Sequence, residues 1–302
     1  MDRMDLDKKL FDTCKESDPN LDEIKKLIIA GANTNQSDKY GESIFNDLFL
    51  GLLCDNRDDK RKTAVIVDKI KEIIQLMIDN GWNVKKYGLD TMDGFVFSTY
   101  DHFTFDLYKF MLQYDLTDSP KDYEKALDRV GAEESFQGCE HCHELENLFY
   151  SIYEMIEAKM EGRDFKSIEL YYDAVGITID RIVYFSKSDT LVHKDTFTEY
   201  NEDIGFVCGN KLLVLRDCVN ILFMNNRLKE QPQIDISSVY GKDVIGQQIK
   251  SIDFDYKDII KGTTYYGQPT IIIALANGKK LKFTHNFGEQ LDEKTQARFW
   301  IE

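Results

Sequence analysis

Leu27-Ile28-Ile29-Ala30-Gly31-Ala32-Asn33 returns 50 residues later as Met77-Ile78-Asp79-Asn80-Gly81-Trp82-Asn83. In both copies apolar residues at helical spacing precede a glycine, and glycine after a helix favours the left-handed conformation that ends it. Both copies then run into a Lys-Tyr-Gly sequence, which is typical of a turn, at residues 39–41 and 86–88. A repeated helix end followed by a repeated turn predicts a stack of helical repeats.

Apolar stripes at helical spacing extend this pattern through the first half of the chain. They occupy residues 21–28, 67–78, 103–114 and 145–160, and each has one apolar face. Alternation typical of strands is scarce before Gly176. The first half is therefore predicted to be helical.

The segment from Gly31 to Asn46 resembles the ankyrin repeat. Residues 31–35 fit the Gly-Ala-Asp/Asn helix exit, residues 38–41 fit the hairpin turn, and Glu42-Ser43-Ile44-Phe45-Asn46 stands at the Thr-Pro-Leu-His box without its proline and histidine. The 50-residue spacing exceeds the family period of ~33 residues, and the charged run 55–62 is interpreted as an inserted loop. The resemblance covers about residues 5 to 115, and residues 120 to 175 only by helical continuity. It implies a divergent ankyrin-like stack that works by binding, and the alternative is a generic helical bundle.

After Gly176 the apolar period changes to alternation, which predicts strands. Residues 204–208 and 212–215 flank Gly209-Asn210, and residues 271–275 and 281–283 flank Asn277-Gly278, a pair that favours a two-residue turn. Further strands are predicted at 177–185, 219–224 and 249–254. The predicted fold class is α+β in two domains: a helical repeat domain at 1–176, and an antiparallel sheet, sandwich or small barrel at 177–302.

The second half has the pattern of an internal duplication. Ile179-Asp180-Arg181-Ile182 precedes one hairpin much as Ile249-Lys250-Ser251-Ile252 precedes the other, with offsets of 70 residues for these segments and 68 for the turns. Two unrelated β-meanders could show the same pattern by chance. Both interpretations predict an antiparallel sheet.

Negative charge is concentrated in the helical half. The chain carries a net charge of −16, and residues 181–302 contain 16 acidic and 16 basic residues, so the whole excess lies before residue 181. Residues 101–161 alone hold 15 acidic and 5 basic residues. Such a surface predicts a protein partner with a basic surface, because complementary potentials speed encounter and exclude wrong partners. The predicted partner-binding residues are Asp101, Asp106, Glu133, Glu134 and Glu140.

No motif for catalysis or a cofactor is found, so neither a catalytic residue nor a cofactor is predicted. The Cys139-to-His143 cluster offers soft ligands for zinc, but no second Cys/His pair stands at zinc-finger spacing. The cluster Asp253, Asp255 and Asp258 lacks the glycine and terminal glutamate of an EF-hand loop. Both sets are interpreted as non-ligating, and no metal is expected.

Location and partner class follow from charge and hydropathy. The lysine pairs are dispersed, whereas phosphate binding needs a concentrated positive footprint, so direct nucleic-acid binding is not expected. Neither a secretory signal nor a membrane span is apparent, which predicts a cytoplasmic protein with reduced cysteines and no membrane contact.

The leading prediction is a non-catalytic adaptor or inhibitor, and more specifically an immunity-type or counter-defence protein that neutralises a basic effector. The alternative is an enzyme or small-ligand sensor with its site in the β-rich half. A pocket lined by convergent polar groups in residues 177–302 would favour that alternative. A passive scaffold that joins two partners is the third possibility.

Overall fold

The computed structural model describes residues 2–56, 58–96, 102–134, 142–185, 203–216, 220–225, 233–255, 270–285 and 297–301. Contacts divide the chain into two compact units. The helical unit is Met1–Gly131 with Met155–Phe165, and the β unit is Ala132–Glu154 with Lys166–Glu302. The predicted division into independent domains at residue 176 stays a prediction.

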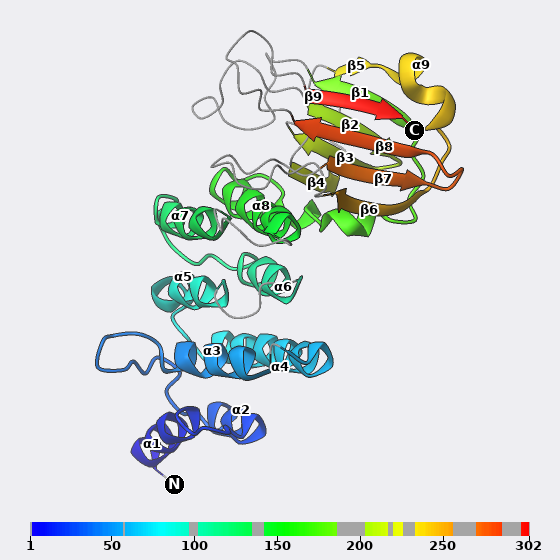
Figure 1. The fold of residues 1–302 in the computed structure, drawn as a ribbon. Coiled ribbons are helices and arrows are strands. Elements are labelled where there is room, and N and C mark those ends of the chain that lie inside the picture. Colours follow the sequence, from blue (N-terminus) through cyan, green and yellow to red (C-terminus); the bar gives the residue numbers. More distant parts are fainter. Residues whose placement is uncertain are drawn as a thin grey trace, which may run out of the picture. The chain divides into compact units, whose positions relative to one another are not determined.

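The helical unit is a stack of antiparallel helix pairs. Helices α1, α3 and α5 form one layer and α2, α4 and α6 the other, with each pair packed on the next (Figure 1). The bounds are α1 Arg3–Cys14, α2 Leu21–Ile29, α3 Ile44–Asn56, α4 Lys60–Asp79, α5 Val84–Phe95 and α6 His102–Met111. The two helices that follow, α7 Asp122–Glu134 and α8 Cys142–Met160, each contribute residues to both units. Stacking of this kind lets each helix pair bury an apolar face that it could not bury alone.

The apolar stripe predicted at residues 67–78 is the buried face of α4. Its members from Val67 to Met77 are at most 2% exposed: Val67, Ile70, Ile73, Ile74 and Met77. Burial of each such side chain contributes roughly 1.5–3 kcal/mol relative to exposure. The predicted helices near 21–28, 103–114 and 145–160 are likewise confirmed by α2, α6 and α8.

The two Lys-Tyr-Gly sequences have different structures. At residues 39–41 the turn is confirmed: Gly41 has φ 87°, and Oδ1 of Asp38 accepts the N–H groups of Tyr40 (2.8 Å) and Glu42 (3.0 Å). At residues 86–88 the predicted turn is wrong, because these residues lie inside α5. The side chain of Asn83 accepts the N–H of Lys86 and caps α5, which begins at Val84, three residues after Gly81.

The charged run 55–62 is not an inserted loop. Helix α3 extends to Asn56 and α4 begins at Lys60, where Oδ1 of Asp59 accepts the N–H groups of Arg61 (3.1 Å) and Lys62 (3.2 Å). The repeat is long because its helices are long: α3 has 13 residues and α4 has 20. Charged residues at these positions cap helices, and the composition of the run alone does not distinguish a cap from a loop.

The β unit contains two antiparallel sheets, so the predicted α+β class with antiparallel strands is confirmed. One sheet has the order β4-β3-β2-β1-β5 and the other β6-β7-β8-β9. The short β5 and the C-terminal β9 were not predicted. The bounds are β1 Arg181–Phe185, β2 Asp203–Cys208, β3 Lys211–Arg216, β4 Asn220–Asn225, β5 Gln233–Asp235, β6 Ile249–Asp255, β7 Thr270–Leu275, β8 Lys280–His285 and β9 Ala297–Ile301.

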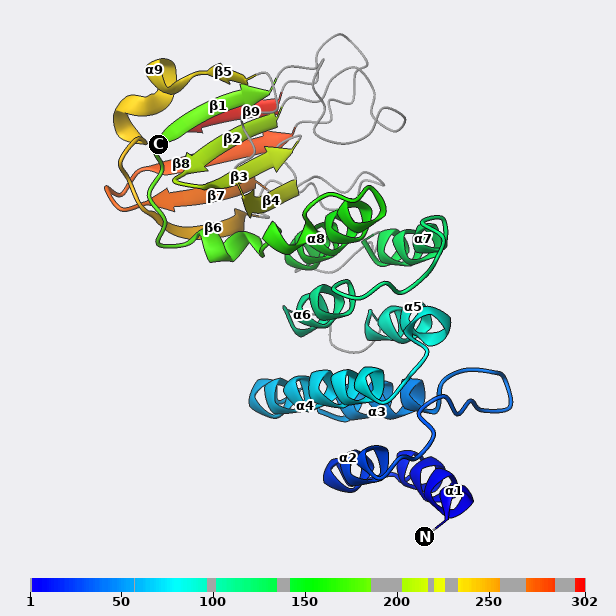
Figure 2. The same cartoon turned by 180° about the vertical axis from the view of Figure 1, so that it is seen from behind.

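The two sheets face each other across one apolar core. Figure 1 views the pair from the β6–β9 side and Figure 2 from the β1–β4 side. The rings of Phe206 and Phe283 meet edge to face at 5.9 Å between their centroids, and both are fully buried. Alternate residues of each strand supply this core, as in a β-sandwich.

One of the two predicted turns differs in length. Gly209-Asn210 joins the paired residues Cys208 and Lys211, as predicted. The second loop has three residues, because the N–H of Leu275 donates to the carbonyl of Lys279 (2.9 Å) and the N–H of Gly278 donates to that of Leu275 (3.0 Å). Gly278, with φ 85°, supplies the left-handed residue that such three-residue loops need.

Hydrogen bonds join the two segments that begin the predicted halves of the β unit. The segments 176–179 and 246–249, offset by 70 residues, pair with each other so that equivalent groups exchange donor and acceptor roles. Thr178 and Gln248 form an antiparallel bridge between them. The four bonds run from the N–H of Gly176 to the carbonyl of Ile249 (2.7 Å), Gly246 to Ile179 (2.8 Å), Ile249 to Ile177 (3.0 Å) and Ile179 to Gln247 (3.0 Å).

Short helices precede both of these segments: η1 Phe165–Ser167 and η2 Tyr171–Ala174 in the first copy, and α9 Ser237–Tyr240 and η4 Gly241–Asp243 in the second. Ala174 and Val244, again 70 residues apart, are both fully buried in the common core. Any antiparallel pair exchanges hydrogen bonds reciprocally, so this pairing does not distinguish duplication from two unrelated β-meanders. The internal duplication stays a prediction.

The edge of β4 is held by a buried amide. Oδ1 of Asn147, on α8, accepts the N–H of Ile221 at 2.6 Å, and Asn147 is 1% exposed. Replacing Asn147 with Ala leaves that buried N–H without its acceptor, so we expect a loss of about 1–2 kcal/mol in the free energy of unfolding of the β unit. Urea unfolding of the variant measures the loss, and an unchanged midpoint would contradict this role for Asn147.

Candidate functional site: the loop edge of the helical unit

Three connections between successive helix pairs run along one side of the helical unit (Figure 1). They comprise residues 30–43 between α2 and α3, residues 80–83 between α4 and α5, and residues 112–121 between α6 and α7. We call these connections together the loop edge. Because helices pack their apolar faces on one another, such connections are where a stack presents polar groups to a partner.

The repeated stretches form the same helix end. The N–H of Ala32 donates to the carbonyl of Leu27 (3.0 Å), and the N–H of Trp82 donates to that of Met77 (2.9 Å). Gly31 and Gly81 adopt φ 94° and 85°. A glycine in this conformation with this hydrogen bond defines a Schellman cap, so the predicted caps are confirmed.

Polar side chains tie each connection to its neighbour. Oδ1 of Asp7, on α1, accepts the N–H of Asn33 at 2.6 Å. One connection further along, the side chain of Asn35 donates to the carbonyl of Gly81 (2.8 Å) and accepts the N–H of Asn83 (2.6 Å). The phenol of Tyr87 also donates to the carbonyl of Asn35 at 3.2 Å. These bonds fix the backbone of adjoining loops in one register.

The hairpin within residues 36–44 presents an aromatic ring to solvent. Tyr40 is 75% exposed at its tip. Its backbone is held by Asp38, and a bridge between Ser37 and Ser43 closes the base of the hairpin. The ammonium of Lys39 lies 4.7 Å from the ring centroid, over one face. An ordered, exposed tyrosine loses little side-chain entropy on binding, and tyrosine is enriched in binding hot spots.

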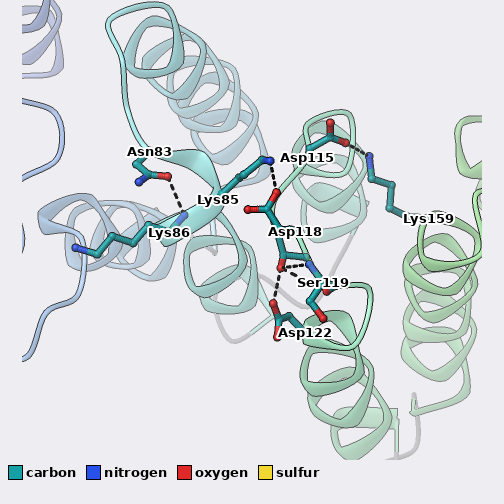
Figure 3. Close-up of polar contacts among 9 residues, drawn as sticks. Asn83, Lys85, Lys86, Asp115, Asp118, Ser119, Asp122 and Lys159 are labelled. Carbon is teal, nitrogen blue, oxygen red and sulfur yellow. Dashed lines mark hydrogen bonds and ion pairs between the residues drawn. The ribbon is translucent and has the colours of Figure 1, made fainter.

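Acidic residues of the third connection form the other part of the loop edge (Figure 3). Lys85, at the start of α5, pairs with Oδ1 of Asp118, and Nζ of Lys159 lies 3.3 Å from Oδ1 of Asp115. The side chains of Asp118 and Asp115 are 79% and 84% exposed. The hydrogen bond and charge of Asp118 raise the pKa of Lys85 above its usual value. Both carboxylates are thus fixed in position while remaining in contact with water.

Of the predicted partner-binding residues, only Asp106 has a described side chain. Asp101 and Glu140 lie outside the described residues, and the side chains of Glu133 and Glu134, at the end of α7, are outside them too. Asp106 lies on α6 in the other helix layer, with its carboxylate 3.8 Å from Nζ of Lys71. Sequence reasoning missed Asp115 and Asp118. The available signal was their position just after the predicted helix 103–114, where a connection must begin.

Burial reduces the acidic surface below what the sequence implies. Glu154 and Glu157 of α8 are 1% and 3% exposed, and Nη2 of Arg163 lies 3.3 Å from Oε2 of Glu157. These two carboxylates belong to the 15 acidic residues of segment 101–161 but are closed to a protein partner. The exposed charge of this segment is therefore smaller than the count suggests.

Asp93, on α5, is a third buried carboxylate, at 4% exposure. Its Oδ2 lies 3.0 Å from Nη1 of Arg129 on α7, whereas Oδ1 has no hydrogen-bond partner among the described residues. Burial raises the pKa of Asp93 to about 6, because the attraction of Arg129 does not offset it and the charge of Asp90 adds to it. Arg129 is 52% exposed, so water weakens its attraction.

Two clusters in the sequence, one of cysteine and histidine and one of aspartate, carry side chains that could ligate a metal. Within the described part of the chain, no three His, Cys, Asp or Glu side chains converge as ligands would. Cys139 and His141 lie outside that part, and Asp253 and Asp255 are spread along β6. Among the described cysteines, Cys14, Cys54 and Cys208 are free. Burial raises the pKa of the Cys14 and Cys208 thiols to about 12, so both are protonated at neutral pH.

Comparisons with protein-family models, curated proteins and solved structures found no match to this chain. Among the described residues, none of the helices combines the length and the low charge needed to cross a bilayer.

Proposed function

We propose that this chain is a non-catalytic protein-binding adaptor or inhibitor, cytoplasmic, whose helical unit is a divergent ankyrin-like stack. Its loop edge contacts a basic surface of the partner protein. A more specific proposal is an immunity-type or counter-defence role, in which binding neutralises a basic effector. The proposal treats the helical and β units as two domains.

The observation that carries the proposal is a pair of exposed carboxylates, each held in place by a lysine. Asp115 and Asp118 project into solvent from a connection held by Lys85 and Lys159. Because the lysines restrain these side chains, less entropy is lost when a cationic group binds. Both carboxylates already contact the ammonium group of a lysine. A basic partner would offer the same kind of cationic side chain.

Capture from a native lysate tests the proposal. The tagged full chain is expected to retain a basic protein at low salt and to release it at high salt, because exposed charges are screened. A variant with Asp115→Lys and Asp118→Lys is expected to bind that protein at least about tenfold more weakly.

The matched control is Asp243→Lys with Asp253→Lys, which changes the net charge equally at exposed positions of the β unit. It is expected to bind the partner like the wild type. Equal binding by both double variants would show that the loop edge does not contact the partner. Circular dichroism verifies that both variants are folded.

A further inference from the structure

We propose that the loop edge selects arginine over lysine, so that the partner presents an arginine-rich segment. This inference rests on the proposed function and specifies the chemistry of the partner. Two features of the loop edge carry it independently: the exposed ring of Tyr40 and the second oxygens of Asp115 and Asp118.

Tyr40 offers a face on which a guanidinium can stack. Lys39 covers one face of the ring at 4.7 Å, and the residue is 75% exposed. At this exposure most of the side chain is accessible to a partner. A planar, weakly hydrated guanidinium stacks on a tyrosine ring through both its charge and its π system, whereas an ammonium is a compact and strongly hydrated charge. The position of Lys39 Nζ over the ring has the geometry of a cation–π contact.

The carboxylates are each contacted at one oxygen only. Lys85 pairs with Oδ1 of Asp118 and Lys159 with Oδ1 of Asp115, and no hydrogen bond to either Oδ2 is found among the described residues. A guanidinium donates two parallel N–H groups that match both oxygens of a carboxylate, which an ammonium does not do. Lys85 is 49% exposed and can return to water when an arginine replaces it.

The ring and the carboxylates lie on different connections of the loop edge, so the proposed partner segment has more than one arginine. Tyr40 and Asp118 belong to different connections, and the bonds of Asn35 to Gly81 and Asn83 hold the intervening loops in register. We therefore assign the ring and the carboxylates to different arginines of the segment. A segment with several arginines satisfies both positions without reordering the loops, which keeps the entropy cost of binding low.

Two peptides of equal length and charge, nona-arginine and nona-lysine, test this selectivity. Titrated into the full chain at about 0.15 M salt, nona-arginine is expected to bind at least about tenfold more tightly. Tyr40→Ala is expected to weaken nona-arginine by about threefold to tenfold and to change nona-lysine little. Asp118→Asn is expected to weaken nona-arginine more than nona-lysine.

Two matched controls separate recognition from general attraction. Val65→Ala removes an exposed apolar side chain from α4, and Asp253→Asn removes an exposed charge from the β unit. Neither should change the affinity for nona-arginine. Equal affinity for the two peptides, or equal losses in the Asp253→Asn and Asp118→Asn variants, would overturn the selectivity but leave the proposed function standing. Binding of neither peptide would count against the proposed function itself.

Discussion

Asp93→Asn is expected to stabilise the helical unit at pH 7.5 by about 3 kcal/mol and to remove a pH dependence between pH 4 and pH 6. Burial raises the pKa of Asp93 from 3.8 to about 6 in the folded protein. The folded state therefore holds this proton more tightly than the unfolded state. The stability gained from this tighter proton binding is fully present below pH 3.8 and is lost as pH rises through 6. Each unit by which the pKa is raised corresponds to about 1.4 kcal/mol. An asparagine carries no charge to desolvate, and the half-exposed Arg129 remains hydrated.

The measurement is urea unfolding at a series of pH values, followed by the helical signal in circular dichroism. Subtracting the variant from the wild type isolates Asp93 from the other titrating groups. Asp68→Asn is the matched control, because Asp68 is exposed on α4 of the same unit, and it should change stability by less than about 0.5 kcal/mol. Parallel pH profiles for wild type and Asp93→Asn would refute the assignment.

The double variant Gly31→Val with Gly81→Val is expected to lose about 2–4 kcal/mol of stability in the helical unit. Both glycines adopt positive φ, at 94° and 85°, in caps that end α2 and α4. A side chain at φ above zero costs about 1–2 kcal/mol, and a β-branched residue fits this region poorly. No atom lies within 4 Å of the added Cβ at either site, so the cost arises from the backbone alone.

Gly51→Ala is the opposite control. Gly51 lies inside α3, away from positive φ, and its Cβ would also meet nothing within 4 Å. Alanine in a helix interior is favoured over glycine by about 1 kcal/mol, so this variant should be more stable than the wild type. Equal unfolding midpoints for the double variant and the wild type would show that the caps do not require glycine.

The candidate site could be predicted only in part. The sequence locates the negative charge in residues 101–161, but the described residues of that stretch include the buried Glu154 and Glu157 as well as the exposed Asp115 and Asp118. Charge counts do not separate these classes, because an acidic residue on a helix faces the core or the solvent according to the packing of neighbouring helices. The contact of Lys85 with Asp118 spans 33 residues and exists only because two connections lie next to each other in the stack.

Local patterns determined the elements of this protein. The spacing of apolar residues predicts α2, α4, α6 and α8, and the glycines at 31 and 81 mark the helix ends. Alternation with Gly209-Asn210 predicts the β2–β3 hairpin. These features follow from interactions between residues close in sequence, so the local sequence pattern is enough to predict them.

Tertiary structure decided the remaining features. Residues 86–88 form helix in one copy although 39–41 form a turn in the other, because Asn83 caps α5 directly after the Schellman cap. The register of the loop edge, the burial of Asp93 and the reciprocal pairing of 176–179 with 246–249 join residues far apart in sequence. Their free energies depend on which surfaces packing brings together and desolvates, and local sequence does not encode that arrangement.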